Sequence, residues 1–137
     1  MALIDALLKE WQKKTERKWD RFYVAVDLHD TIFRSNYSGL SVDIIPEAIP
    51  ALKLLSDNPE ICIILSTGSY APDIEKYIQH LNEHGINIDY VNENPEVPSN
   101  DLSDFSKKYY FNLFFDDKAG FIDSDWKTVR DFFVQVK

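Results

Sequence analysis

The sequence predicts an α/β fold, in which a mainly parallel sheet is flanked by helices in a three-layer, Rossmann-like arrangement. Short apolar, β-branched runs alternate along the chain with longer segments of helical periodicity. Polar and acidic residues follow these runs rather than interrupt them. A length of 137 residues with 45% hydrophobic residues suits one domain with a substantial core.

Residues 2–19 have the periodicity of an amphipathic helix, with apolar side chains on one face and Lys and Arg on the other. We expect this N-terminal helix (1–21) to pack on a core formed by residues 22–137. A docking helix for a partner, or for a second copy of the chain, is the alternative. Contact of this helix with nucleic acid or a membrane surface is a weaker third interpretation, and neither a membrane partner nor nucleic acid other than a phosphorylated end is expected.

The remaining elements are predicted in the order strand, helix, strand, helix, strand, loop, strand, helix. The expected strands are 22–27, 61–65, 86–91 and 111–115, and the expected helices are 47–57, 72–84 and 124–135. Pro46 favours a helix start, while Asn58-Pro59 and Gly85 favour helix ends. Either Asp123 or Asp125 is expected to be the N-cap of the last helix.

Charge and cysteine content restrict the class of protein. Residues 1–21 carry six Lys or Arg and four Asp or Glu, whereas the net charge of the whole chain is −8. The strongly acidic remainder argues against broad nucleic-acid binding and suits a site for a divalent cation. The single Cys62 lies in an apolar run, which predicts a buried thiol and a cytoplasmic location. Neither a signal peptide nor a membrane span is expected.

Three predicted strands are followed by residues that suit phosphate and metal chemistry. They are Asp27-Leu-His-Asp-Thr31, Ser66-Thr-Gly-Ser69 and Asp116-Asp117. Because the carboxyl ends of parallel strands lie at one edge of a sheet, these side chains should converge. Carboxylates suit Mg²⁺, hydroxyl and ammonium groups hold phosphate oxygens, and a carboxylate can attack phosphorus.

Together with Lys108, these segments resemble the four motifs of the haloacid dehalogenase (HAD) superfamily, in its phosphatase branch. The first motif is matched by the strand that ends in Asp27, and the second by Ile63–Ser66. Lys108 matches the third motif, and Phe114–Asp117 matches the fourth. The resemblance covers about residues 22–135, nearly everything except the first helix.

The resemblance implies a Mg²⁺-dependent phosphatase in which Asp27 is the nucleophile and forms an aspartyl-phosphate. The implied metal ligands are Asp27, Asp116, Asp117 and the backbone carbonyl of His29. The implied phosphate-binding residues are Ser66, Thr67 and Lys108, with Lys107 as the alternative lysine.

His29 stands where the family has an aspartate that serves as general acid and base. An imidazole can also protonate a leaving oxygen and later activate water, so the expected function is phosphomonoester hydrolysis through Asp27 and His29. The alternative is a catalytically weak or inactive HAD-fold protein that acts by binding or regulation. A receiver-type phosphoacceptor fits poorly, because its acidic pair follows the first strand.

The chain has no room for the cap domain that this family usually carries. The insertion after the first motif runs only from Phe33 to about Pro46, and residues 69–107 are needed for a helix, a strand and a loop. An uncapped site admits large phosphorylated substrates, a phosphorylated polynucleotide end among them, or is covered by a second copy of the chain. The expected substrate contacts are Phe33, Arg34, Tyr37 and the loop 92–101.

Overall fold

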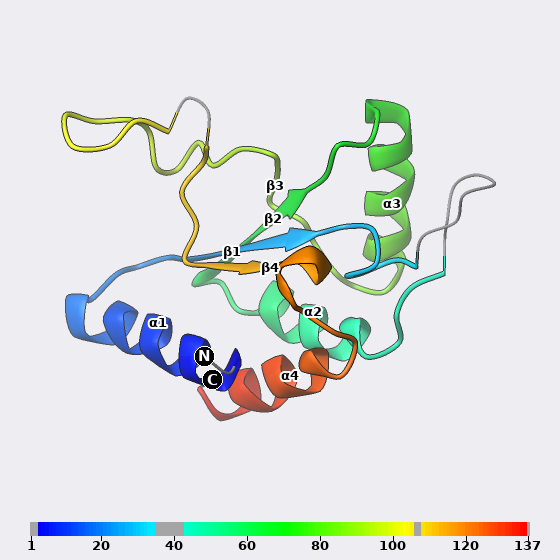
Figure 1. The fold of residues 1–137 in the computed structure, drawn as a ribbon, viewed down its shortest axis with the longest axis horizontal. Coiled ribbons are helices and arrows are strands. Elements are labelled where there is room, and N and C mark those ends of the chain that lie inside the picture. Colours follow the sequence, from blue (N-terminus) through cyan, green and yellow to red (C-terminus); the bar gives the residue numbers. More distant parts are fainter. Residues whose placement is uncertain (1–2, 35–42, 106–107, 137) are drawn as a thin grey trace.

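The chain folds around a four-stranded parallel sheet with the strand order β3-β2-β1-β4 (Figure 1). The computed structural model describes residues 3–34, 43–105 and 108–136. The elements are α1 (Leu3–Arg17), β1 (Phe22–Asp27), α2 (Ala48–Asp57), β2 (Ile61–Ser66), α3 (Ala71–Glu83), β3 (Tyr90–Val91), β4 (Leu113–Phe115), the 3₁₀ turn η1 (Asp117–Ala119) and α4 (Asp125–Gln135). The predicted α/β class is confirmed, without a second domain in these residues.

The centre of the sheet consists of β1 and β2, which are continuous apolar runs and therefore suit burial on both faces. The first five residues of each strand are buried, and the last, Asp27 or Ser66, is half-buried. The two strands pair in register from Phe22 with Ile61 to Asp27 with Ser66. This register places the Asp27 and Ser66 backbones side by side at the carboxyl edge of the sheet.

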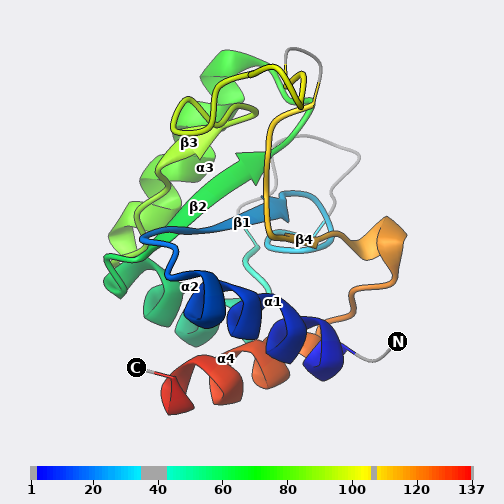
Figure 2. The same ribbon diagram turned by 90° about the vertical axis from the view of Figure 1, so that its left-hand side faces the viewer.

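Helices cover one face of the sheet. The helices α1, α2 and α4 lie together on this face (Figure 2), and α3 joins the same core through Tyr77 and Leu81. Alternate residues of β1, namely Phe22, Val24 and Val26, belong to this core because side chains alternate between the two faces of a strand. Each fully buried side chain of this size contributes roughly 1.5–3 kcal/mol, so the helical layer holds the central strands firmly.

The N-terminal helix α1 packs against α4 and β4. Leu7 is fully buried, and the ring of Trp11 meets Phe22 and Phe133 edge-on at centroid distances of 5.1 and 5.6 Å. Lys14 is buried as well and pairs with Glu60 at 3.0 Å. The apolar face of α1 therefore contacts the core, as the periodicity of residues 2–19 predicts.

The opposite face of the sheet is covered by the segment between β3 and β4, which contains no helix in its described part. Here Tyr23, Cys62 and Ile64 form a second, smaller core. The residues packed on it are Tyr90, Val97, Tyr109, Tyr110 and Phe111. A right-handed connection from β3 back to β4 has to pass over this face, so the third layer of the fold is an aromatic loop. The predicted burial of the Cys62 thiol is confirmed.

The strands β3 and β4 begin later than predicted, because polar side chains replace backbone pairing at their starts. The Asp89 N–H donates to the Ile63 carbonyl at 3.0 Å, and the Asp89 carboxylate accepts from the Ile63 N–H at 2.8 Å. Asn112 makes the same two kinds of bond to Tyr23, both at 2.8 Å. A side chain that takes the neighbouring N–H leaves no backbone ladder at that position.

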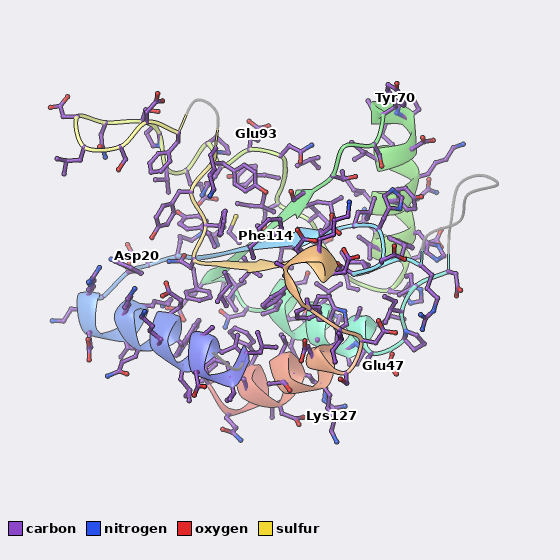
Figure 3. The ribbon with its side chains drawn as sticks, in the orientation of Figure 1. Asp20, Glu47, Tyr70, Glu93, Phe114 and Lys127 are labelled. Atoms are coloured by element: carbon purple, nitrogen blue, oxygen red, sulfur yellow. The ribbon has the colours of Figure 1, made fainter. Side chains whose placement is uncertain are left out.

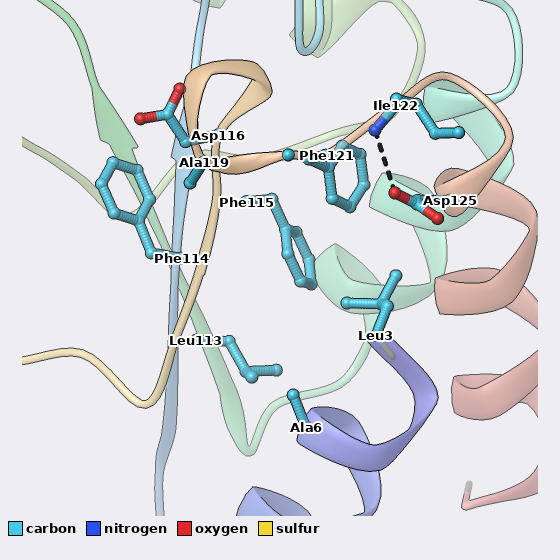
Figure 4. A pocket seen from close by; sticks show the side chains of 11 residues that line it. Leu3, Ala6, Leu113, Phe114, Phe115, Asp116, Ala119, Phe121, Ile122 and Asp125 are labelled. Atoms are coloured by element: carbon cyan, nitrogen blue, oxygen red, sulfur yellow. Dashed lines mark hydrogen bonds between the residues drawn. The ribbon is translucent and has the colours of Figure 1, made fainter. Parts of the chain in front are cut away.

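The observed helices begin and end within two residues of the predicted bounds. Gly85 ends the α3 segment with a φ of 76°, a left-handed conformation that glycine adopts at little cost. The predicted cap of α4 was wrong. Its N-cap is Ser124, which makes no side-chain capping bond, while the Asp125 carboxylate accepts from the Ile122 N–H at 2.9 Å (Figure 4).

None of the helices in the described ranges combines the length and the apolar composition that a membrane span requires.

Candidate functional site

Three carboxylates meet at the carboxyl edge of the sheet. Asp27 ends β1, Asp116 directly follows β4, and Asp117 opens η1. Because Val26 of β1 pairs with Phe115 of β4, the residues that follow this pair lie next to one another. One oxygen of each carboxylate lies within 4.8 Å of the other two, and all three residues are half-buried.

Thr31 connects two of these carboxylates. Its hydroxyl accepts from the Asp117 N–H at 3.0 Å, and it lies 3.3 Å from Oδ2 of Asp27 and 3.5 Å from Oδ1 of Asp117. The Thr31 carbonyl accepts from the indole N–H of Trp126 at 2.8 Å. Helix α4 therefore fixes the turn after β1, and the turn fixes the carboxylate cluster.

The cluster raises the pKa of the Asp27 carboxyl to about 7. Burial is the largest cause, the hydrogen bond with Asp117 and the charges of Asp116 and Asp117 add to it, and the Thr31 hydroxyl opposes it. Three carboxylates this close repel one another unless a cation or a proton lies among them. An all-oxygen, half-buried donor set of this charge fits a divalent metal ion.

His29 lies two residues beyond Asp27 and lines the same cavity. Its Nε2 lies 3.1 Å from the hydroxyl of Ser69, and its ring meets the ring of Tyr77 edge-on at 5.5 Å. Ser69 was not among the predicted site residues. Its only sequence signal is its place in the polar run that follows β2.

Thr67 is engaged within the loop that follows β2. Its hydroxyl donates to Ser69 Oγ at 3.0 Å and accepts from the Ser69 N–H at 3.1 Å. Asn92, the residue after β3, accepts from the Thr67 N–H at 2.9 Å and donates to the Thr67 carbonyl at 2.6 Å. Asn92 was predicted as the start of a loop and, with the rest of residues 92–101, as a substrate contact. In the structure it holds the turn that carries Ser66 and Thr67.

The residues around this edge of the sheet line a cavity of about 520 Å³ that is open to solvent. The three carboxylates, His29 and Asn92 line it, together with residues 66–68 and Lys118. Phe114 of β4, labelled in Figure 3, is the large apolar residue among those that line it. Asp27, His29, Ser66, Thr67, Asp116 and Asp117, all predicted site residues, thus border one space.

Lys108 is the predicted site residue that the structure does not bring to the carboxylates. Its ammonium lies 5.6 Å from the ring centroid of Phe111, in a separate hollow of about 280 Å³. Within the described ranges, Lys118 is the lysine that borders the carboxylate cavity. The alternative, Lys107, lies outside the described residues, as does Tyr37.

Two predicted substrate contacts have other partners. Phe33 is fully buried and packs on Tyr77 at a centroid distance of 4.7 Å, so it is not available to a substrate. Arg34 pairs with Asp123 at 3.2 Å and approaches Asp43 at 4.0 Å. The segment after β1 is therefore anchored at its described start.

A solved structure of a conserved protein from Bacteroides thetaiotaomicron is similar to this chain. The TM-score is 0.65 with 26% sequence identity, over 85% of this chain and 93% of that one. No protein-family model and no curated protein matches the chain. The structural likeness supports the parallel α/β fold over most of the chain, while membership of the HAD superfamily stays a prediction from the motifs.

Proposed function

We propose that this protein is a Mg²⁺-dependent phosphomonoester hydrolase of the HAD type, with Asp27 as the nucleophile. The observation that carries the proposal is the carboxylate cluster, in which one oxygen each of Asp27, Asp116 and Asp117 lies within 4.8 Å of the others. The hydroxyl-bearing loop after β2 borders the same cavity of about 520 Å³. Carboxylates and hydroxyl groups around one open cavity are what phosphoryl transfer requires.

The three carboxylates would hold the metal ion together with the backbone carbonyl of His29. Bound Mg²⁺ supplies positive charge that offsets the carboxylates and the phosphoryl oxygens. Without a cation, the pKa of Asp27 is raised to about 7, which leaves much of this carboxyl protonated near neutral pH and unable to attack. The metal site and the nucleophile are thus coupled.

The phosphoryl group would lie between the cluster and the loop after β2. Ser66 and Gly68 line the cavity, and both the hydroxyl and the N–H of Thr67 are used within the loop. Lys118 would add the cationic contact. Asp27 forms a bond to phosphorus as the leaving oxygen departs with a proton from His29, and water then displaces the carboxylate.

Hydrolysis of p-nitrophenyl phosphate with and without Mg²⁺ tests the proposal. We expect turnover that requires Mg²⁺, is abolished by Asp27→Asn and is kept by Asp131→Asn, which alters an exposed carboxylate of α4. Failure to hydrolyse every member of a panel of aryl, sugar, nucleotide and polynucleotide-end phosphates, with Mg²⁺ or Mn²⁺, would overturn it.

The second candidate is a HAD-fold protein that binds a metal ion and a phosphorylated ligand without turnover. His29 at the acid–base position and Lys108 over the Phe111 ring both favour it. The substitution His29→Asp separates the two candidates. Phosphatase activity that arises only in this variant would make the unmodified protein a binding module.

A further inference from the structure

We infer that Ser69 is a positioning residue for His29. The Ser69 hydroxyl engages Nε2 of the imidazole ring, and this leaves Nδ1 to exchange the proton with the substrate and water. This inference rests on the proposed phosphatase function. Its starting point is the 3.1 Å contact between His29 Nε2 and Ser69 Oγ. His29 lines the cavity whereas Ser69 is not part of its wall, so Ser69 acts through His29.

The hydrogen bonds around Ser69 leave it free to bond to His29 throughout a reaction. Its Oγ accepts from the Thr67 hydroxyl at 3.0 Å, so one lone pair and its own proton are left over. Ser69 can therefore accept from a protonated Nε2 or donate to a bare one. The Nε2 atom stays engaged whichever form the ring takes.

The Ser69 hydroxyl is itself held in place by two neighbouring elements. Its N–H donates to Thr67 Oγ1 at 3.1 Å, and Asn92 ties the backbone of Thr67 to the end of β3. On the other side, the Tyr77 ring of α3 contacts the His29 ring edge-on at 5.5 Å. A ring contact and a fixed hydroxyl together define the orientation of an imidazole, because a half-turn of the ring about the Cβ–Cγ bond would put Cε1 in the place of Nε2 opposite the hydroxyl and break the hydrogen bond.

The proton balance of the proposed reaction agrees with this arrangement. The imidazolium gives its Nδ1 proton to the leaving oxygen, as the bond from that oxygen to phosphorus breaks and the Asp27 oxygen bonds to phosphorus. The neutral ring keeps its proton on Nε2 and donates it to Ser69. In the second step, Nδ1 takes a proton from water, whose oxygen bonds to phosphorus as the bond to Asp27 breaks. Because the Ser69 hydroxyl keeps Nε2 engaged in both steps, Nδ1 is the nitrogen that exchanges the proton, and the ring with its proton on Nε2 is the tautomer that the reaction needs.

A spectroscopic test needs neither metal nor substrate. The chain has three histidines, and the imidazole N–H signal of His29 therefore has to be assigned in the NMR spectrum of the EDTA-treated protein. It is the signal that disappears in the variant His29→Asn. We expect this proton on Nε2, visible because its hydrogen bond slows exchange with water. It should disappear in Ser69→Ala and remain in Ser69→Thr. Ser103→Ala, which alters an exposed loop serine, is the control.

A kinetic test addresses the catalytic consequence. In Ser69→Ala, kcat for an alkyl phosphate should fall about tenfold more than kcat for p-nitrophenyl phosphate, with KM unchanged, because only the poor leaving group needs the proton. Ser69→Thr should restore the rate.

The failures of the two proposals are distinguishable. Absence of turnover in the unmodified protein defeats the phosphatase, and the proton-transfer role of Nδ1 with it. Equal losses on the two substrates in Ser69→Ala, or a His29 N–H signal that survives this substitution, defeat the positioning role of Ser69 in an enzyme that is otherwise active.

Discussion

The backbone N–H of Asp117 donates to the hydroxyl of Thr31, with the two atoms 3.0 Å apart, although the residues are separated by 86 positions in the sequence. This bond joins the turn after β1 to the turn after β4. The hydroxyl keeps its own proton for a carboxylate of Asp27 or Asp117. A single buried side chain thereby holds the candidate nucleophile and a candidate metal ligand in one place.

Thr31→Val should weaken both the fold and the metal site, because valine has the same shape but leaves the Asp117 N–H without its acceptor. An unsatisfied buried donor costs about 1–3 kcal/mol of unfolding free energy. Urea unfolding in EDTA measures this loss, and Thr31→Ser, which keeps the hydroxyl, should recover most of it. Equal stability of Thr31→Val and the unmodified protein would show that the bond contributes little.

Asp116→Asn should separate metal binding from folding. Removal of one of three repelling carboxylates leaves the melting temperature in EDTA unchanged or raises it. The same variant should lose most of the stabilisation by Mg²⁺, which for the unmodified protein is about 2.7 kcal/mol at a concentration one hundred times Kd. Thermal unfolding with EDTA and with Mg²⁺ measures both effects.

The control for this experiment is Asp131→Asn on α4, a carboxylate that pairs with Arg130. It should respond to Mg²⁺ like the unmodified protein. A full Mg²⁺ response in Asp116→Asn would remove this residue from the metal site.

Glu96 should make the stability of the fold depend on acidic pH. Its carboxylate accepts from Arg21 at 2.9 and 3.1 Å and from the hydroxyls of Tyr23 and Tyr90, which ties the loop after β3 to the sheet. The Arg21 hydrogen bond is the main reason that the pKa of Glu96 lies below its ordinary value of 4.5. A lowered pKa in the folded state gives stability that is present above the ordinary pKa and is lost as the pH falls below it.

Urea unfolding at a series of pH values tests this dependence. The unfolding free energy of the unmodified protein should fall more steeply below about pH 4.5 than that of Glu96→Gln. Glu93→Gln, an exposed neighbour, should behave like the unmodified protein. If the unfolding free energies of Glu96→Gln and the unmodified protein changed in parallel with pH, the lowered pKa of Glu96 would not be the cause of the loss of stability in acid.

Lys118→Ala should raise KM for phosphomonoesters about tenfold if its ammonium binds a phosphoryl oxygen, since a charge-assisted hydrogen bond is worth more than 1 kcal/mol. Lys108→Ala should change KM little, because the Lys108 ammonium lies over the Phe111 ring. Steady-state kinetics of the two variants side by side decide between the lysines. A larger effect at Lys108 would mean that the segment before β4 rearranges when substrate binds.

The central strands and their polar ends could be predicted because each is a continuous apolar run that stops at a carboxylate or a hydroxyl. The starts of β3 and β4 could not, because Asp89 and Asn112 replace the backbone pairing with their own side chains. Hydrophobic periodicity does not indicate where a side-chain hydrogen bond takes the place of backbone pairing.

The convergence of Asp27, Asp116 and Asp117 follows from parallel strand order alone, and the structure confirms that they form a cluster that could hold a metal ion. The surroundings of His29 do not follow from it. Ser69 and Asn92 act through turns that bend back toward the sheet edge, and the location of Lys108 depends on the path of a long loop over the far face. Their roles depend on loop geometry that spacing in the sequence does not specify.

Isolation of the phosphorylated protein tests the central claim most directly. The variant His29→Ala, which should slow hydrolysis of the intermediate, is mixed with a phosphomonoester and Mg²⁺, quenched in acid and mapped by peptide mass spectrometry. We predict one phosphoryl group on the peptide that contains Asp27, labile to hydroxylamine as an acyl phosphate is, and absent from the double variant that also carries Asp27→Asn. Phosphate on another residue, or hydrolysis that persists in Asp27→Asn, would contradict the assignment of Asp27 as the nucleophile.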